Sequence, residues 1–127
     1  MSHFLQSVIT AVGSDVFGLL EGRVLILYGL DAPPDLAELS VLHRVECEPA
    51  RAAPSVGAVI RIGTVESRIT AIGDRAWPTL ADIGHVLVSF NGAAATERAG
   101  EICAEPVDLL ALAAMLAAGN PISVAEA

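Results

Sequence analysis

The sequence predicts an all-β fold, a small closed or partly closed β-barrel with an internal pseudo-two-fold repeat and one or two short helices. Short segments with period-2 alternation and many β-branched residues recur along the chain, separated by Gly, Pro and Asp. In addition, two stretches of the chain resemble each other. Because closing a sheet removes the edges that a small β protein must otherwise protect, this combination favours a barrel.

The strand pattern occurs in several separate segments. They span residues 5–12, 23–28, 40–47, 57–62, 65–72 and 85–90. Gly63 and Thr64 are the only residues between two of these segments, which predicts a tight hairpin at that point.

The internal repeat relates residues 7–13 to residues 67–73, in which Ser, Ile, Thr, Ala and Gly recur in register. After a small shift the likeness continues between residues 22–28 and 84–90. We therefore expect each half to run from a strand, through a short loop or turn, into a second strand.

Two segments are expected to be helical. Residues 34–39 begin at a Pro-Pro-Asp start signal, and residues 106–118 are rich in Ala and Leu and are followed by Gly119-Asn120-Pro121. The second segment is either a helix or a frayed tail. As a helix it is apolar almost all round, so it would pack on the barrel or on a second subunit, which leaves a homo-oligomer open.

Length and composition indicate one domain over residues 1–127, with a hydrophobic content of 54% that excludes a disordered chain. The longest near-continuous apolar run, residues 109–118, is about half of the roughly 20 residues that a membrane-spanning helix needs. The N-terminus lacks the basic region of a secretory signal. A cytoplasmic location is therefore expected.

The charge of the chain is strongly acidic, with 15 Asp and Glu against 7 Arg and Lys and a net charge of −8. Such a chain repels nucleic acid and anionic lipid and favours a basic partner surface. The only two cysteines, Cys47 and Cys103, are expected to be reduced thiols that fill the core.

His43 is the main candidate for a residue with a chemical function. In a strand over residues 39–48 it shares an apolar face with Val41 and Val45, and this alone favours a histidine packed in the core. The chain has no Gly-rich phosphate loop, no Ser/His/Asp triad and no paired-carboxylate spacing that would indicate another enzyme.

Three stretches around the histidines carry a resemblance to a known family. They are Ala-Pro-Pro-Asp-Leu-Ala-Glu-Leu leading into Val-Leu-His over residues 32–43, Ile-Thr-Ala-Ile-Gly over residues 69–73, and residues 80–92 with Ile-Gly-His at 83–85. The chain resembles the glucitol/sorbitol-specific enzyme IIA components of the bacterial phosphoenolpyruvate-dependent sugar phosphotransferase system.

The resemblance implies a phosphocarrier with a phosphohistidine intermediate and no cofactor. Such a protein accepts a phosphoryl group from the histidine-containing phosphocarrier protein and passes it to a cysteine on enzyme IIB for glucitol/sorbitol uptake. It reaches the membrane only through the enzyme IIB/IIC permease components. His43 falls at the phosphorylated histidine of the family, and a neutral imidazole on a water-excluding face suits that role.

His85 matches the histidine of a Leu-Gly-His stretch in the family, which implies that it stabilises the phosphate or orients His43. In the internal repeat Arg23 occupies the equivalent position, so it is a further candidate for reaching the phosphate. Some members carry a second histidine two residues beyond the phosphorylated one, where this chain has Val45. That position cannot be essential here.

Two other functions stay open from the residues alone. One is a non-catalytic regulatory or binding barrel, in which Trp77 is either an exposed partner anchor in the loop before His85 or a plug over a barrel end. The other is a metal site built from His43, Cys47 and His85, although the chain has no Cys-x-x-Cys or His-x-x-x-His spacing.

Overall fold

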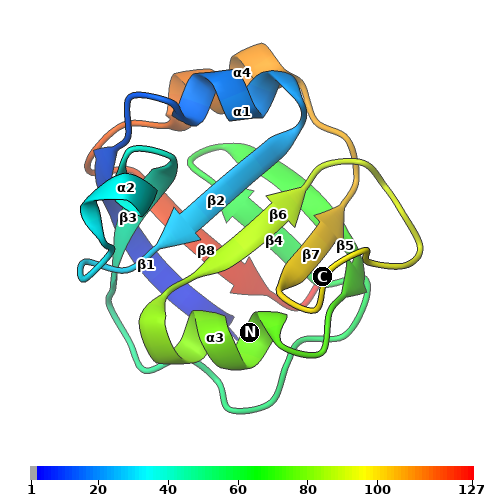
Figure 1. Cartoon of the computed structure of the whole chain (residues 1–127). Coiled ribbons are helices and arrows are strands. Elements are labelled where there is room, and N and C mark those ends of the chain that lie inside the picture. Colours follow the sequence, from blue (N-terminus) through cyan, green and yellow to red (C-terminus); the bar gives the residue numbers. More distant parts are fainter. Residues whose placement is uncertain (1–2) are drawn as a thin grey trace.

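The structure, a computed structural model, describes residues 3–127 and folds into a closed barrel of eight strands, as predicted (Figure 1). The strands are β1 (His3–Val12), β2 (Val24–Tyr28), β3 (Ser40–Val45), β4 (Val59–Ile62), β5 (Val65–Ile72), β6 (Val86–Ser89), β7 (Glu101–Ala104) and β8 (Pro121–Ala125). Around the barrel they follow the order β1-β3-β2-β6-β7-β5-β4-β8.

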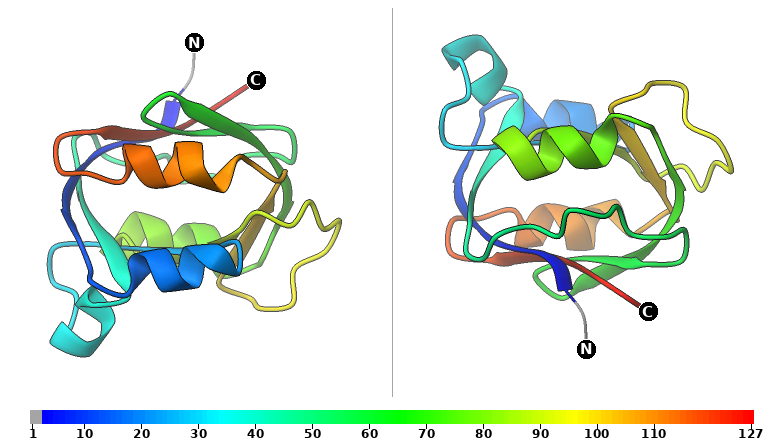
Figure 2. Two further views of the ribbon diagram at one scale, coloured as in Figure 1. Left: turned by 90° about the horizontal axis from the view of Figure 1, so that it is seen from above. Right: turned by 90° about the horizontal axis from the view of Figure 1, so that it is seen from below.

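The helices are α1 (Val16–Glu21), α2 (Pro34–Ala37), α3 (Ala76–Ile83) and α4 (Leu109–Met115). Helices α1 and α4 cover one end of the barrel, and α3 covers the opposite end (Figure 2). The described residues therefore hold four helices, and the expectation of one or two is wrong. In particular, each half runs strand, helix, strand, not strand, loop, strand.

Local sequence explains why α1 and α3 escaped prediction. Helix α1 is only six residues long and contains Gly18, and α3 contains Pro78. Proline is tolerated here because it lies in the first turn, where the backbone N–H groups have no partner within the helix. The N-cap residues, Asp15 of α1 and Arg75 of α3, make no side-chain hydrogen bond to the first turn, so neither helix is stabilised by a cap.

The internal repeat is confirmed as a pseudo-two-fold arrangement, with β1-α1-β2 equivalent to β5-α3-β6. In each half the first strand pairs antiparallel with a further strand, β3 or β7, and that strand pairs parallel with β2 or β6. The pairing register even shifts at the same place in both halves, between Ile9 and Ala11 and between Ile69 and Ala71. His43 pairs with Ile9, whereas Ala104 pairs with Ile69. The two halves thus share a backbone, but only one of them carries an imidazole.

The predicted hairpin at residues 63–64 is present, because β4 and β5 pair antiparallel with Ile62 opposite Val65. Strands β7 and β8 lie outside the six predicted segments. All four residues of β7 are buried, so it shows no alternation, and β8 begins with Pro121. A strand that is buried on both faces or that starts at proline gives a weak period-2 signal.

Helix α4 resolves the alternative left open for residues 106–118. Asp108 caps it by accepting hydrogen bonds from the backbone N–H groups of Leu110 and Ala111, and Leu112 and Leu116 are buried against the barrel. Leu110 is 84% exposed. The segment is therefore a short capped helix that packs on its own barrel.

Trp77 is a plug at the α3 end of the barrel. It lies in α3, is 1% exposed, and donates from Nε1 to the Ala50 carbonyl at 2.7 Å. Its ring meets Phe4 edge to face at 6.1 Å between centroids. The interpretation of Trp77 as an exposed anchor in a loop is wrong.

The two cysteines are free thiols in different surroundings. Cys103 is buried, as predicted, but Cys47 is exposed. Strand β3 ends at Val45, so the alternation that would have placed Cys47 inside does not extend to it. Within residues 3–127, none of the helices is long and apolar enough to cross a membrane.

Candidate functional site

His43 lies on β3 with its side chain directed into the barrel. It is 1% exposed, and Val41 on the same face is fully buried. Arg44 and Glu46 on the opposite face are exposed. The sequence-based prediction of an apolar, inward-facing histidine is confirmed.

Both ring nitrogens of His43 have a hydrogen-bond partner. Nδ1 lies 2.7 Å from Ser7 Oγ on β1, and Nε2 lies 2.8 Å from the Gly84 carbonyl oxygen at the end of α3. A carbonyl oxygen can only accept, so in the neutral ring the hydrogen is on Nε2. The lone pair is then on Nδ1, where it accepts from the Ser7 hydroxyl.

The charge state of His43 follows from its surroundings. Burial lowers the pKa of the ring because it penalises the imidazolium, and the hydrogen bond to the Gly84 carbonyl raises the pKa by a smaller amount. The net shift is downward from 6.5. The ring is therefore neutral at pH 7 and has an unprotonated nitrogen.

Gly84 holds its carbonyl against His43 through an unusual backbone geometry. It ends α3 in the left-handed region, with φ of 75°, where glycine is favoured over residues with a Cβ. A Cβ at this position would lie 2.9 Å from Gly29 Cα and 3.2 Å from His43 Nε2. Glycine at position 84 thus serves both the helix end and the close approach to the imidazole.

A pocket of about 350 Å³ opens beside His43, between the end of β2 and the end of α3. Its lining residues are Tyr28, Gly29, Leu30, Asp31, His43, Arg44, Val45, Pro49, Ala81, Asp82, Ile83 and Gly84. Among these lining residues, Arg44 carries the one guanidinium or ammonium group, and Asp31 and Asp82 carry carboxylates. The imidazole is therefore buried in the barrel wall and still borders an open pocket.

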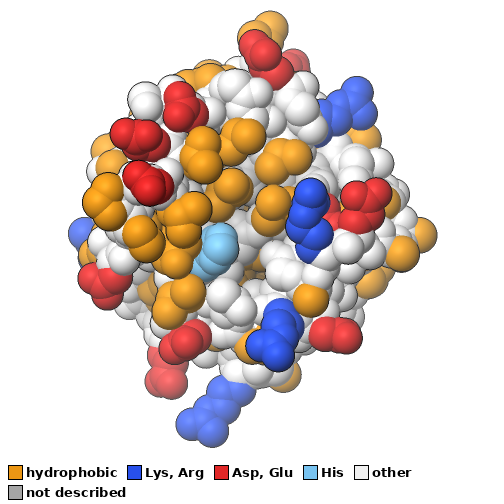
Figure 3. Space-filling view, in the orientation of Figure 1, with side chains coloured by type: hydrophobic (Ala, Val, Ile, Leu, Met, Phe, Trp, Pro, Cys, Tyr) orange, Lys and Arg blue, Asp and Glu red, His pale blue; other side chains and the backbone are white. Residues whose placement is uncertain are grey.

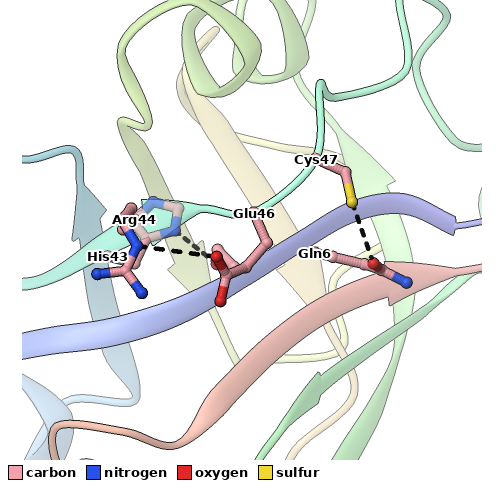
Figure 4. Close-up of polar contacts among 6 residues, drawn as sticks. Gln6, His43, Arg44, Glu46 and Cys47 are labelled. Carbon is pink, nitrogen blue, oxygen red and sulfur yellow. Dashed lines mark hydrogen bonds and ion pairs between the residues drawn. The ribbon is translucent and has the colours of Figure 1, made fainter.

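Arg44 is held only loosely. Its Nε lies 3.7 Å from Glu46 Oε2, and both side chains are about half exposed (Figure 4). Exposed ion pairs of this kind contribute little, about 0 to 1 kcal/mol, so the guanidinium is free to exchange its partner. Sequence reasoning missed Arg44, although its position next to His43 was the available signal.

His85 is near the pocket but does not line it. Its ring stacks on Tyr28 at 4.3 Å between centroids and 16° between planes, and Tyr28 is one of the lining residues. Partial burial lowers the pKa of His85. His85 is therefore connected to this pocket only through its stacking on Tyr28.

Arg23 is not brought to this site. It is exposed, with φ of 66°, and its carbonyl accepts from the Phe90 N–H at the end of β2 opposite Tyr28. The pseudo-two-fold axis places Arg23 and His85 at equivalent positions, but on opposite ends of the paired strands β2 and β6.

The metal alternative finds no support in the arrangement of side chains. Among residues 3–127, no group of three or more His, Cys, Asp or Glu side chains is placed to hold a metal ion. The Cys47 thiol donates to Gln6 Oε1 at 3.5 Å and turns away from His43 (Figure 4).

The structure is thus a closed barrel in which one doubly hydrogen-bonded imidazole lies at the wall of an open pocket. The family model described as PTS system glucitol/sorbitol-specific IIA component matches residues 4–122. The chain therefore belongs to this family, which is part of a sugar phosphotransferase system.

Individual relatives agree with this assignment. The PTS system glucitol/sorbitol-specific EIIA components of Escherichia coli (strain K12) and Shigella flexneri are each 29% identical over 103 residues, which is 80% of this chain and 81% of theirs. The crystal structure of the PTS system IIA component from Enterococcus faecalis V583 has a TM-score of 0.73 at 20% identity. It covers 95% of this chain and 99% of its own, and supports the barrel fold.

Proposed function

We propose that this protein is a phosphocarrier that accepts a phosphoryl group on His43 from the histidine-containing phosphocarrier protein. It passes the group to the cysteine of enzyme IIB for glucitol/sorbitol uptake. The observation that carries the proposal is the His43 ring itself, which is neutral, held at both nitrogens, and part of the pocket wall.

The transfer needs only an electron pair on a fixed nitrogen. That pair attacks the phosphorus of the donor's phosphohistidine, the donor's N–P bond breaks, and its electron pair returns to the donor imidazole. Attack through Nδ1 would keep the hydrogen bond from Nε2 to the Gly84 carbonyl, but the Ser7 Oγ that covers Nδ1 at 2.7 Å would first have to move aside. Attack through Nε2, on the side of Gly84 and the pocket, would break the bond to the Gly84 carbonyl and require the proton on Nδ1, where Ser7 Oγ can accept it.

The pocket suits a transient phosphoryl group. Apolar lining residues limit the access of water, which would otherwise hydrolyse the phosphoramidate. Arg44 supplies positive charge for the phosphoryl oxygens, because its contact with Glu46 is weak and easily exchanged. Asp31 and Asp82 add negative charge to the pocket, so further stabilisation of the phosphoryl oxygens has to come from basic residues of the donor or acceptor protein.

His85 is proposed to help onward transfer through its stacking on Tyr28. Replacing His85 by Gln is expected to slow transfer to enzyme IIB more than it slows labelling by the phosphocarrier protein. Stopped-time labelling and chase kinetics measure both rates. Equal kinetics for the variant and the parent protein would remove the role.

The complete function is tested by following phosphate from phosphoenolpyruvate to the sugar. With phosphoenolpyruvate, enzyme I and the phosphocarrier protein, the chain should take up an acid-labile phosphoryl group. Membranes containing enzyme IIB/IIC should then transfer this group to added glucitol and form glucitol phosphate. His43→Gln should do neither, and His3→Gln, at an exposed position on β1, should do both. A wild-type protein that binds its partners but is never labelled would be a regulatory barrel.

A further inference from the structure

Gly84 covers the ring nitrogen of His43 that borders the pocket. Its carbonyl oxygen lies 2.8 Å from Nε2, and both residues belong to the pocket lining. The other ring nitrogen, Nδ1, is covered by Ser7 Oγ, and Ser7 is not among the lining residues. A phosphoryl group that enters through the pocket therefore meets Nε2 and the carbonyl that covers it.

This contact makes Nε2 inactive as a nucleophile in the resting ring. A carbonyl oxygen only accepts, so Nε2 carries the hydrogen and has no electron pair for phosphorus. To expose an electron pair on the pocket side, the hydrogen of the neutral ring has to be on Nδ1 and the Gly84 carbonyl has to move away. The Ser7 hydroxyl allows the first change, because it can accept from Nδ1–H as well as donate to Nδ1.

The turn that carries this carbonyl is built from glycine backbone. Gly84 ends α3 with φ of 75°, and the Gly29 N–H beside it donates to the Ile83 carbonyl at 3.1 Å. Because glycine adopts many backbone conformations at little cost, rotation about the Gly84 backbone bonds can redirect its carbonyl. Ile83 is 44% exposed and lines the same pocket. A protein that docks on this face therefore contacts the turn directly.

The second half of the barrel lacks this arrangement. Gly22 is the equivalent of Gly84 in the internal repeat, but it ends α1 with φ of −87°, and the left-handed conformation falls on Arg23 instead. Ala104 stands where the first half has His43, so no ring is present to be covered. The left-handed glycine thus occurs in the half of the barrel that carries the imidazole.

We infer that the Gly84 carbonyl is a removable cap on Nε2, which keeps His43 masked until the turn after α3 moves aside. On opening, Nδ1 takes up a proton from solvent and Nε2 releases its own to water in the pocket, which leaves an electron pair on Nε2. This pair forms the bond to phosphorus while the N–P bond of the donor's phosphohistidine breaks and its electron pair returns to the donor imidazole. The last step rests on the proposed function, whereas the cap is a property of the unphosphorylated protein.

The first test uses the unphosphorylated protein and needs no partner. NMR of ¹⁵N-labelled histidine at pH 7.5 should show His43 with its hydrogen on Nε2. Gly29→Ala adds a Cβ 2.5 Å from the Ile83 carbonyl oxygen and should displace the turn, whereas Gly18→Ala on α1 has nothing within 4 Å of its new Cβ. Diethyl pyrocarbonate, which acylates imidazole nitrogens, should modify His43 about threefold to tenfold faster in Gly29→Ala, the effect of one lost hydrogen bond.

Gly18→Ala is the matched control and should react with the reagent at the wild-type rate. Mass spectrometry of the peptide that contains His43 follows the reaction, and urea unfolding confirms that each variant is folded. A resting Nδ1–H tautomer, or equal rates for Gly29→Ala and wild type, would overturn the cap whether or not the protein is ever labelled.

The second test is the nitrogen of His43 that carries the phosphoryl group after labelling through the phosphocarrier protein. NMR of ¹⁵N and ³¹P should find the group on Nε2, and the ¹³C resonance of the Gly84 carbonyl should shift because its donor is gone. A phosphoryl group on Nδ1, or an unchanged Gly84 resonance, would contradict the removable cap. A wild type that gives the expected first result but is never labelled would refute the proposed function and leave the masked resting ring established.

Discussion

At the scale of single residues, the site is a ring held between a hydroxyl and a carbonyl. The sequence predicted His43 and its inward direction, because alternation along a strand is a local property. It did not predict Ser7 or Gly84 as its partners, since these contacts depend on strand register and on where a helix ends. The predictions of a buried Cys47 and of a Trp77 in a loop failed for a related reason, because the end of a strand and the start of an uncapped helix leave little trace in the sequence.

Gly84→Ala is predicted to destabilise the protein and to disturb the His43 ring. A Cβ in the left-handed region costs about 1 to 2 kcal/mol, and here it would also press on Gly29 and Nε2. Gly57→Ala is the matched control, because Gly57 has φ of 100° but nothing within 4 Å of the added Cβ. Urea unfolding should show a larger loss for Gly84→Ala. Equal losses would mean that the contact with His43 is unimportant.

The lowered pKa of His43 predicts a pH dependence of stability. Well above pH 6.5 the ring is neutral in both the folded and the unfolded chain and adds no pH dependence. As the pH falls below 6.5, the unfolded chain binds the proton first, so the free energy of unfolding should decrease. His85 shifts in the same direction. Urea unfolding at pH 7.5, 6.5 and 5.5 measures this, and His43→Gln should weaken the dependence. A stability that rises towards pH 5.5 would contradict it.

At the scale of elements, the strands of the barrel were easier to predict from the sequence than the helices that connect them. The six predicted strands could be found because each has one buried and one more exposed face. Helices α1 and α3 could not, since they contain Gly18 and Pro78 and are stabilised by packing on the barrel ends. Strand β7 was missed because burial of all its residues removes the alternation.

Trp77→Phe is predicted to lower the free energy of unfolding by about 2 kcal/mol, from reduced packing and from loss of the hydrogen bond to the Ala50 carbonyl. Leu110→Ala, on the exposed side of α4, should change it by less than about 0.5 kcal/mol. Chemical denaturation monitored by circular dichroism compares the two. A Trp77→Phe variant as stable as Leu110→Ala would show that the plug is dispensable.

At the scale of the whole molecule, apolar and acidic surface meet around one pocket. Apolar side chains gather over β2 and β6, with acidic side chains towards α2 (Figure 3). Leu30 and Ile83 are 57% and 44% exposed and line the His43 pocket. With a net charge of −8, this face suits a partner with an apolar centre and a basic edge.

Leu30→Asp is accordingly predicted to raise KM for the phosphocarrier protein by about tenfold, since a charge replaces apolar contact at the pocket mouth. Leu110→Asp introduces the same charge on α4, at an even more exposed position, and should leave KM unchanged. Labelling kinetics at several phosphocarrier concentrations distinguish them. Similar KM values for both variants would place docking elsewhere.

The central claim is that the phosphoryl group resides on His43, and the most direct measurement is its position in the labelled protein. The wild type is labelled from phosphoenolpyruvate through enzyme I and the phosphocarrier protein, digested at alkaline pH to preserve phosphohistidine, and mapped by mass spectrometry. The phosphoryl group should be found on His43 alone. A phosphoryl group on His3 or His85, or none on any residue, would contradict the claim.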